Sequence, residues 1–283
     1  MIPDWETNCV FLAATLEARH PGVFKGLQQA LVSHGVEVRL LQNTKDIWVR
    51  DFAPIQVTDR TFVKFRYEPD YLRGDHEQWK TGDEVLDSLR QLGTFRHSDI
   101  VLDGGNVVVS REKVILTDKV YKENPHVSRE QLRRQLQELF QVDQLIVIPK
   151  QAYDPIGHSD GVVRFLNEDS VVMNDYTHFD PAYGETVQKV LKRFRLQIEL
   201  LPHFEERKTV EGIPSAVGNY VNLLYTEKVL VAPQYGADPD EEAVKTLERL
   251  LPNRKIVPLE CTGLAREGGA FNCATFSCKR VLS

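Results

Sequence analysis

The sequence predicts an α/β protein, specifically a five-bladed α/β propeller with pseudo-fivefold symmetry. Two observations predict it: one pattern recurs five times along the 283 residues, and each copy combines a helix, a strand, a polar loop and a hairpin. A copy of about 57 residues is too small to close a core alone, so five copies are expected to pack as a ring of small sheets. We expect residues 1–283 to form one domain.

The helix of each copy is recognised from apolar residues at helical spacing, and a short apolar strand follows it within a few residues. The predicted helices cover residues 23–34, 82–92, 128–141, 184–195 and 240–251, the third with Ser128 as its N-cap. The predicted strands cover residues 36–41, 100–102, 145–148, 198–201 and 256–259.

Each copy ends in a predicted hairpin, whose two arms are rich in Val, Ile, Phe and Leu around a polar tip. The hairpins cover residues 53–65, 106–118, 161–174, 220–232 and 272–283. The first copy then lacks one strand, which we expect from the other end of the chain or from the segment WETNCVFLA at 5–13.

Composition narrows the class of partner. The formal net charge is −6 and no basic run stands out, which disfavours nucleic acid and anionic membranes and favours a cationic small molecule. Apolar runs are far shorter than a membrane span requires, and the first residues do not resemble a signal peptide, so we expect a cytoplasmic protein. Four cysteines without metal-ligand spacing predict no zinc site.

The polar loops between strands and hairpins carry the residues suited to chemistry. In a ring of sheets these loops converge at one end, so residues far apart in the sequence meet. Cys273 and His158 suit nucleophilic catalysis, because a base or cation favours the thiolate, and Asp51, Asp103 and Asp160 suit a cationic substrate. The alternative roles are structural: a buried thiol, a core histidine and turn-stabilising aspartates.

Four motifs follow one another along the chain: WVRD at 48–51, DGGN at 103–106, GHSD at 157–160 and GGAFNCAT at 268–275. Their order resembles that of the agmatine deiminase and bacterial-type (Porphyromonas-type) peptidylarginine deiminase family, in the pentein superfamily of guanidine-modifying enzymes. The resemblance runs from Trp5 through residues 62–72 and 219–236 to Cys273.

This resemblance implies a five-fold pseudosymmetric propeller and a hydrolase of linear amidines that needs neither metal nor organic cofactor. Such an enzyme converts a guanidino group to a ureido group, with release of ammonia, through a covalent amidino-cysteine intermediate. By motif, Cys273 matches the nucleophile and His158 the acid/base. Asp51 and Asp160 match the carboxylates that bind the guanidinium, and Asp103 matches the acidic residue that orients the histidine.

Several positions depart from the family pattern. Asp103 stands where agmatine deiminases typically have Glu, Asn272 where a His usually precedes the nucleophile, and Ala270 where a third Gly is usual. The segment at 65–79 lacks the family's Ala-Trp-Gly-Gly stretch. The substrate therefore stays open among agmatine, arginine and other guanidino compounds.

Further residues are expected at the pocket or, alternatively, as braces of the core and loops. They are Trp48, Arg50, Asn106 and Asn219. Residues 67–79 suit either a lid or a solvated loop. An amidinotransferase with the same intermediate and a non-catalytic guanidine-binding homologue remain as alternative functions, and the oligomeric state is open, with a homodimer as one candidate.

Overall fold

The computed structural model describes residues 1–281, whose strands form five three-stranded sheets and one two-stranded sheet. In each three-stranded sheet the middle strand pairs antiparallel with one neighbour and parallel with the other. The sheets are β17 (Thr275–Cys278), β1 (Cys9–Ala13) and β2 (Glu37–Leu41); β3 (Ile55–Thr58), β4 (Thr61–Arg66) and β5 (Thr94–Val101); β6 (Val108–Val109), β7 (Lys113–Thr117) and β8 (Gln144–Ile148); β9 (Val163–Phe165), β10 (Ser170–Asn174) and β11 (Gln197–Leu201); and β14 (Leu224–Tyr225), β15 (Val229–Gln234) and β16 (Lys255–Glu260). The small sheet pairs β12 (Thr209–Val210) with β13 (Ile213–Pro214).

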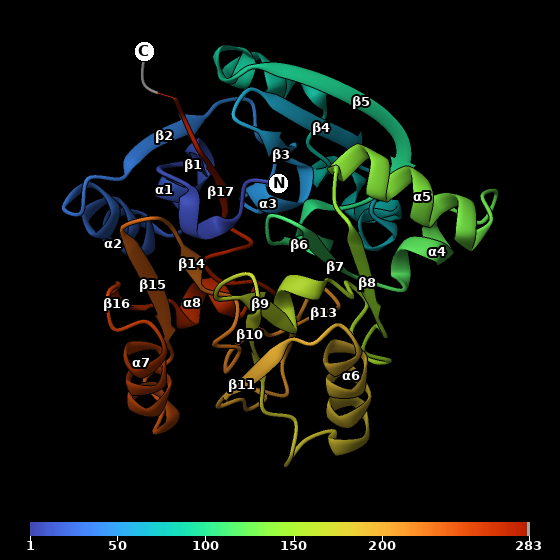
Figure 1. Cartoon of the computed structure of the whole chain (residues 1–283). Helices are drawn as coiled ribbons and strands as arrows, with labels where there is room; N and C mark the ends of the chain where they lie inside the picture. The colour runs from blue at the N-terminus through green and yellow to red at the C-terminus, as the bar shows by residue number, and fades with distance from the viewer. Residues whose placement is uncertain (282–283) are drawn as a thin grey trace.

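Helical crossovers connect the middle strand of each sheet to its parallel neighbour, as parallel pairing requires. The crossover helices are α1 (Ala14–Arg19), α2 (Pro21–Val32), η2 (Asp70–Leu72), η3 (Gly74–Trp79), η4 (Asp83–Leu92), α4 (Lys119–Glu123), α5 (Arg129–Phe140), α6 (Pro181–Arg193) and α7 (Pro239–Leu250), where η marks a 3-10 helix. Helices α2, α5, α6 and α7 lie at the periphery of Figure 1, and strands β2 and β5 form its upper edge. The chain thus has an α/β fold, and within residues 1–281 the sheets stay separate and do not close into a barrel.

The five predicted helices are confirmed, although their boundaries differ by a few residues. Ser128 caps α5 as predicted, because its hydroxyl accepts a hydrogen bond from the Gln131 amide at 3.2 Å. The segment predicted at 82–92 is the 3-10 helix η4 rather than an α-helix. Its apolar face is nevertheless the predicted one, with Val85 and Leu89 fully buried.

The fifth hairpin prediction, at 272–283, is wrong. Within residues 272–281 only one strand forms, β17, and it pairs antiparallel with β1 near the start of the chain. Because β1 also pairs with β2, it is the middle strand of its sheet. All five of its side chains are buried. After β17 the chain does not turn back, and the backbone amide of Lys279 donates a hydrogen bond to the Gln56 side chain. Residues 282–283 of the predicted hairpin lie outside the described residues.

The missing strand of the first copy comes from the places predicted for it, because the segment at 5–13 and the C-terminal strand meet in one sheet. The strand predicted at 100–102 overlaps the end of β5, which runs from Thr94 to Val101. None of the side chains of Thr94–Asp99 is buried, so this part of the strand does not stand out as an apolar run.

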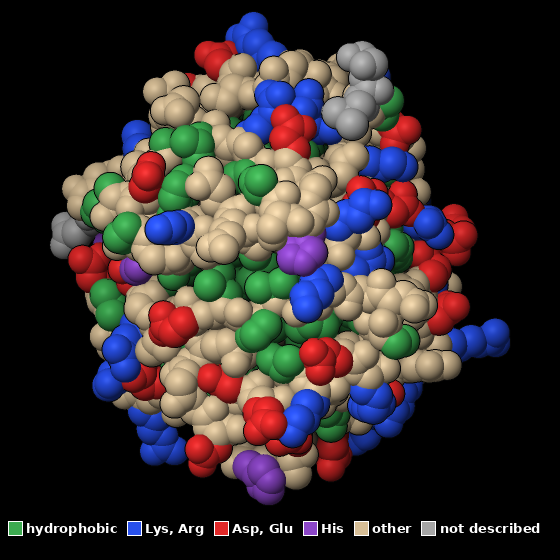
Figure 2. Space-filling model, turned by 90° about the vertical axis from the view of Figure 1, so that its left-hand side faces the viewer, with side chains coloured by type: hydrophobic (Ala, Val, Ile, Leu, Met, Phe, Trp, Pro, Cys, Tyr) green, Lys and Arg blue, Asp and Glu red, His purple; other side chains and the backbone are tan. Residues whose placement is uncertain are grey.

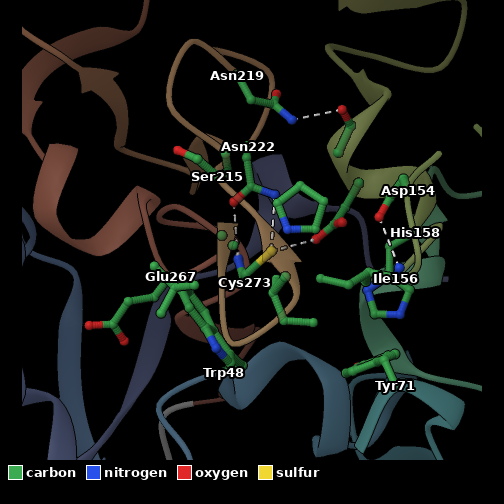
Figure 3. A pocket seen from close by; sticks show the side chains of 18 of the residues that line it. Trp48, Tyr71, Asp154, Ile156, His158, Ser215, Asn219, Asn222, Glu267 and Cys273 are labelled. Atoms are coloured by element: carbon green, nitrogen blue, oxygen red, sulfur yellow. Dashed lines mark hydrogen bonds between the residues drawn. The ribbon is translucent and has the colours of Figure 1, made fainter. Parts of the chain in front are cut away.

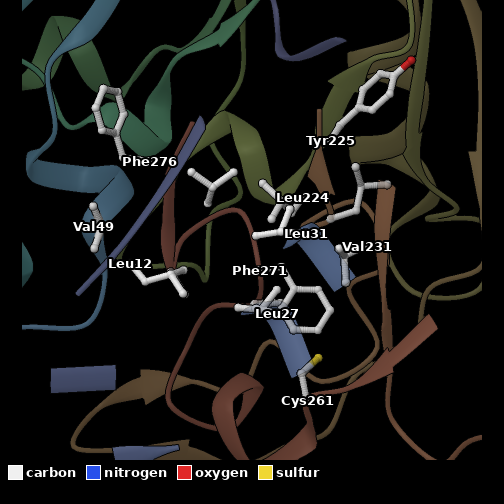
Figure 4. Packing of buried hydrophobic residues seen from close by; sticks show 14 of the residues in the cluster. Leu12, Leu27, Leu31, Val49, Leu224, Tyr225, Val231, Cys261, Phe271 and Phe276 are labelled. Carbon is white, nitrogen blue, oxygen red and sulfur yellow. The ribbon is translucent and has the colours of Figure 1, made fainter. Parts of the chain in front are cut away.

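The hydrophobic core lies between the sheets and their crossover helices. Leu27 and Leu31 of α2 are fully buried and belong to the same cluster as Phe271 and Phe276 near the C-terminus (Figure 4). Cys261 packs in this cluster, which gives it the structural role expected of a buried free cysteine. The core therefore joins the two ends of the sequence.

The surface carries charged side chains of both signs, intermixed around a band of hydrophobic side chains in the face that Figure 2 shows. Among residues 1–281, no helix has the length and apolar character that a bilayer crossing demands.

Candidate active site

Five polar loops follow the strands β2, β5, β8, β11 and β16, and each loop contacts the next in a cycle. The loops contain the short helices α3 (Val49–Phe52), η5 (Gly104–Asn106), η6 (Ser159–Gly161) and α8 (Thr262–Ala265). Successive loops are joined by hydrogen bonds from Ser159 N to Asn106 Oδ1 (3.2 Å), Asn219 Nδ2 to Gly161 O (2.9 Å), Asn272 N to Asn222 O (3.2 Å) and Arg50 N to Cys273 O (3.0 Å). The remaining contact is steric: a Cβ at Gly104 would lie 2.0 Å from Arg50 O. The sequence prediction that these loops converge is confirmed.

A cavity of about 320 Å³ opens among these loops. Of the residues predicted for the site, those that line the cavity are Trp48, Asp51, His158, Asp160, Asn219 and Cys273. Figure 3 shows Cys273 in the middle of this group, with Asn222 above it and with His158 and Tyr71 to one side.

Cys273 is partly buried, and its thiol contacts an amide and a carboxylate. Asn222 Nδ2 lies 3.1 Å from the Cys273 Sγ, and Asp160 Oδ2 lies 3.5 Å from it. Burial raises the pKa of this thiol well above its usual value, and the charges of Asp160 and Asp51 raise it further. Burial and these two carboxylates therefore favour the neutral thiol, and a bound cation would favour its ionisation.

His158 is buried between two carboxylates. Its Nε2 lies 3.0 Å from Asp103 Oδ2, and its Nδ1 lies 3.5 Å from Asp51 Oδ1. Burial alone would lower the pKa of this imidazole, but the Asp51 charge and the Asp103 hydrogen bond raise it to about 9. His158 is therefore protonated at neutral pH, with its Nε2 donating to Asp103 and its Nδ1 forming an ion pair with Asp51. The shorter side chain of Asp103 still reaches the histidine.

Asp51 is buried, and burial raises its pKa to about 7. Its Oδ2 accepts a hydrogen bond from the Tyr71 hydroxyl at 3.2 Å, whereas its Oδ1 has no hydrogen-bond partner among the described residues. The Gly-Gly pair of the DGGN motif permits this arrangement, because a Cβ at Gly105 would lie 2.4 Å from His158 Nδ1 and 2.5 Å from Asp51 Oδ1.

Asp160 is held by the residue that departs from the family pattern. Asn272 Nδ2 donates to Asp160 Oδ2 at 2.6 Å, so the side chain before the cysteine orients this carboxylate. Ala270, the other departure, is fully buried and its amide donates to Asn222 Oδ1 at 3.0 Å. Both departures therefore fit the local structure.

Two predicted pocket residues lie behind the cavity wall. The Arg50 side chain is buried and donates to the Ser277 hydroxyl at 3.2 Å. Asn106 Oδ1 accepts from the amides of Thr117 and Ser159, at 2.8 and 3.2 Å. These contacts match the alternative in which the two residues brace the core and the loops.

Trp48 and Asn219 do reach the cavity. The Trp48 ring packs against Gly269, where a Cβ would lie 2.7 Å from the ring and 2.8 Å from Cys273 Cβ. A glycine is therefore required for the indole to approach the cysteine loop.

Sequence reasoning missed two polar residues of the site. Asn222 Oδ1 accepts from the amides of Ala270 and Cys273, while its Nδ2 contacts the thiol. In the sequence, Asn222 stood out only as a polar residue within the apolar arm predicted as a strand. In the structure, this part of the arm precedes β14, which begins at Leu224. Tyr71 belongs to the segment at 67–79, and this segment supplies part of the cavity wall.

The cavity wall is acidic. The carboxylates that line the cavity beyond Asp51 and Asp160 belong to Asp46, Asp154, Glu205, Glu211 and Glu267, and the exposed Glu205 and Glu211 lie at its mouth. Among residues 1–281, Arg19 is the only lysine or arginine that lines the cavity. It forms ion pairs with Glu267 at 2.5 Å and with Asp46 at 3.6 Å. This charge distribution favours a cationic ligand along the whole cavity.

Comparison with known proteins points to one family. The family model for the Porphyromonas-type peptidyl-arginine deiminase matches residues 10–278. The putative agmatine deiminase of Lactococcus lactis subsp. lactis is 26% identical to this chain, with 88% of this chain and 79% of the relative covered. The agmatine deiminase of Pseudomonas aeruginosa is 25% identical, with 82% and 74% covered.

A solved structure of agmatine deiminase from C. jejuni with substrate bound has the same fold. The two chains superpose with a TM-score of 0.81 at 18% identity, and the superposition covers 100% of this chain and 96% of the other.

Proposed function

The chain belongs to the Porphyromonas-type peptidyl-arginine deiminase family, and on that premise we propose that it is a guanidine deiminase. It hydrolyses a C–N bond of a guanidino group, releasing ammonia and leaving a ureido group. The observation that carries the proposal is that a thiol, a protonated imidazole and two carboxylates line one and the same cavity. The relatives named above are deiminases, which does not favour the amidinotransferase alternative.

Asp51 and Asp160 bind the guanidinium in this proposal. A guanidinium stays protonated and presents planar N–H donors that match carboxylate oxygens. Asp51 Oδ1 is buried without a hydrogen-bond partner among the described residues, so a bound guanidinium N–H would supply the missing donor. Asp160 lies 3.5 Å from the thiol, which places the guanidinium carbon within reach of Cys273.

The covalent step begins when the bound cation favours ionisation of the Cys273 thiol, whose proton passes to solvent. The thiolate adds to the guanidinium carbon, and the tetrahedral adduct collapses as His158 donates its proton to the departing ammonia. This leaves an amidino thioether that retains the rest of the substrate. Neutral His158 then takes a proton from water, the hydroxide adds to the same carbon, and the thiolate leaves to give the ureido product.

The remaining residues position these groups. Asp103 orients His158 and stabilises the imidazolium, and Asn222 fixes the cysteine loop through two backbone amides. Trp48 and Asn219 contribute to the cavity wall against the substrate, whereas Arg50 and Asn106 act on the loops from behind. None of these steps uses a metal or an organic cofactor.

The substrate carries an amine rather than a carboxylate at its far end, because the mouth is lined by carboxylates. We therefore expect agmatine to be hydrolysed with a kcat/KM about tenfold or more above that of arginine. Ammonia release measured with both compounds tests this. Glu205 is exposed at the mouth of the cavity. Glu205→Gln should therefore lower the ratio of kcat/KM for agmatine to kcat/KM for arginine and leave hydrolysis of the C–N bond intact. A preference for arginine would contradict the assigned substrate class, and absence of ammonia from every guanidino compound would contradict the function.

The pH dependence of kcat/KM is expected to rise and then level off. Guanidinium binding requires ionised Asp51, whose pKa is about 7, and the addition step requires the Cys273 thiolate, so activity rises with pH. Departure of ammonia requires protonated His158, so the rise ends as pH increases through the histidine pKa of about 9. Initial rates at low substrate concentration across this range test both features. A rate that still rises well above pH 9 would contradict the role of His158 as the acid.

At the level of the whole chain, we propose that residues 1–283 form a single catalytic domain, a five-bladed propeller of the pentein type. Five sheets of equal strand order and five loops that contact in a cycle support this arrangement. The partner is a guanidino small molecule. The cytoplasmic location and the homodimer stay predictions from the sequence.

A further inference from the structure

One lysine is buried among three carboxylates directly behind the active site. The Nζ of Lys119, in α4, lies 3.3 Å from Asp103 Oδ2, 3.3 Å from Asp70 Oδ1 and 3.1 Å from Glu123 Oε1. Only 1% of the lysine side chain is exposed. A buried charge persists only when it is paired, and these carboxylates raise the pKa of Lys119 above its usual value in spite of burial.

Two of these contacts lead to residues of the cavity wall. Asp103 Oδ2, which binds the lysine, also binds His158 Nε2 at 3.0 Å. Asp70 immediately precedes Tyr71, whose ring lies 4.8 Å from Lys119 Nζ and whose hydroxyl donates to Asp51. Lys119 thus contacts Asp103, which is the partner of His158. It also contacts Tyr71, whose hydroxyl is bonded to the carboxylate of Asp51.

We propose that Lys119 is a positioning residue for the deiminase reaction. It holds Asp103 against His158, and through Asp70 and the Tyr71 ring it holds the Tyr71 hydroxyl on Asp51. The inference rests on the proposed function, in which His158 and Asp51 act on the substrate.

The orientation of Asp103 explains why the lysine is needed. Asp103 is 1% exposed, and its Oδ1 has no hydrogen-bond partner among the described residues. The hydrogen bonds that fix this carboxylate are therefore those of Oδ2, one from His158 and one from Lys119. Without the lysine charge, Asp103, Asp70 and Glu123 would repel one another, and Asp103 would lose its second anchor.

The Tyr71 contact explains a separate effect on binding. The hydroxyl of Tyr71 reaches Asp51 from η2, a helix of three residues that relies on outside contacts for its position. Asp70 is 30% exposed at its side chain and connects η2 to Lys119. Loss of the Asp70 charge should therefore displace Tyr71 and weaken guanidinium binding, while leaving Lys119 on Asp103.

The experiment compares three variants of the full chain by steady-state ammonia release from agmatine. Lys119→Met should lower kcat by about tenfold or more, because the acid/base pair is misplaced. Asp70→Asn should raise KM several-fold with kcat close to that of the unchanged protein. Lys113→Met is the matched control: Lys113 is also buried and paired, with Glu168, but lies at the far end of β7 and outside the cavity wall. It should change neither constant.

The proposal is overturned if Lys119→Met keeps kcat and KM within about twofold of the unchanged protein, or loses no more activity than Lys113→Met. If Lys119→Met does not fold, the test rests on Asp70→Asn. A KM of Asp70→Asn equal to that of the unchanged protein would contradict the link from Lys119 to Asp51 through Tyr71. The unchanged protein is assayed in parallel. If it releases no ammonia the proposed function fails, whereas failure of this inference leaves that activity intact.

Discussion

Replacement of Cys273 by alanine is expected to abolish ammonia release, by about four orders of magnitude or more, while guanidinium binding persists. The thiol is the group at the centre of the cavity that can form the covalent bond, and Asp51 and Asp160, the two carboxylates proposed to bind the cation, come from other loops. Turnover measured by ammonia release and binding measured by calorimetry separate the two properties.

Cys261→Ala is the matched control for this variant. Cys261 is fully buried in the hydrophobic core, and burial raises the pKa of its thiol, so it has a packing role only. Its replacement should lower stability slightly and leave the activity unchanged. Undiminished ammonia release by Cys273→Ala would contradict the nucleophile assignment.

The second large effect is expected at Asp51 and Asp160. Asparagine at either position keeps the shape of the side chain but removes the charge that is proposed to bind the guanidinium. A charge-assisted hydrogen bond of this kind contributes about 1.5 to 3 kcal/mol, so substrate affinity should fall roughly 10-fold to 100-fold for each variant.

Asp59→Asn provides the comparison, because Asp59 lies at the exposed turn between β3 and β4 and should not affect binding. The dissociation constant of agmatine is best measured in the Cys273→Ala background, where no turnover intervenes. Equal affinities for Asp51→Asn, Asp160→Asn and Asp59→Asn would contradict the two-carboxylate site.

The parts of the fold that the sequence predicted correctly are those set by local periodicity. Helix α5, with its Ser128 cap, and four of the five hairpins follow from apolar spacing and turn residues. The pairing of β17 with β1 could be foreseen only as one of two sources for a missing strand, because a contact between the two ends of the chain leaves no mark in local patterns.

The candidate site was predictable where a residue type and a loop position coincide, as at Cys273 and His158. Asn222 and Lys119 were not found, because their importance comes from neighbours distant in sequence: the thiol and two amides for Asn222, and Asp103 and Asp70 for Lys119. Arg50 shows the converse. It stands in the right motif, but its side chain lies behind the wall and bonds to Ser277.

The most direct test of the account is the mass of the intact protein after rapid acid quenching during turnover of agmatine. The proposed mechanism predicts an adduct on Cys273 with the mass of the substrate less that of ammonia, because the alkyl amine stays attached to the amidino carbon. An adduct of the amidino group alone would mean that the alkyl amine had left first, as in an amidinotransferase, so the two reactions differ in their adducts and do not share the one intermediate expected from the sequence. Turnover with no adduct on Cys273, under quenching fast enough to trap one, would contradict the covalent mechanism.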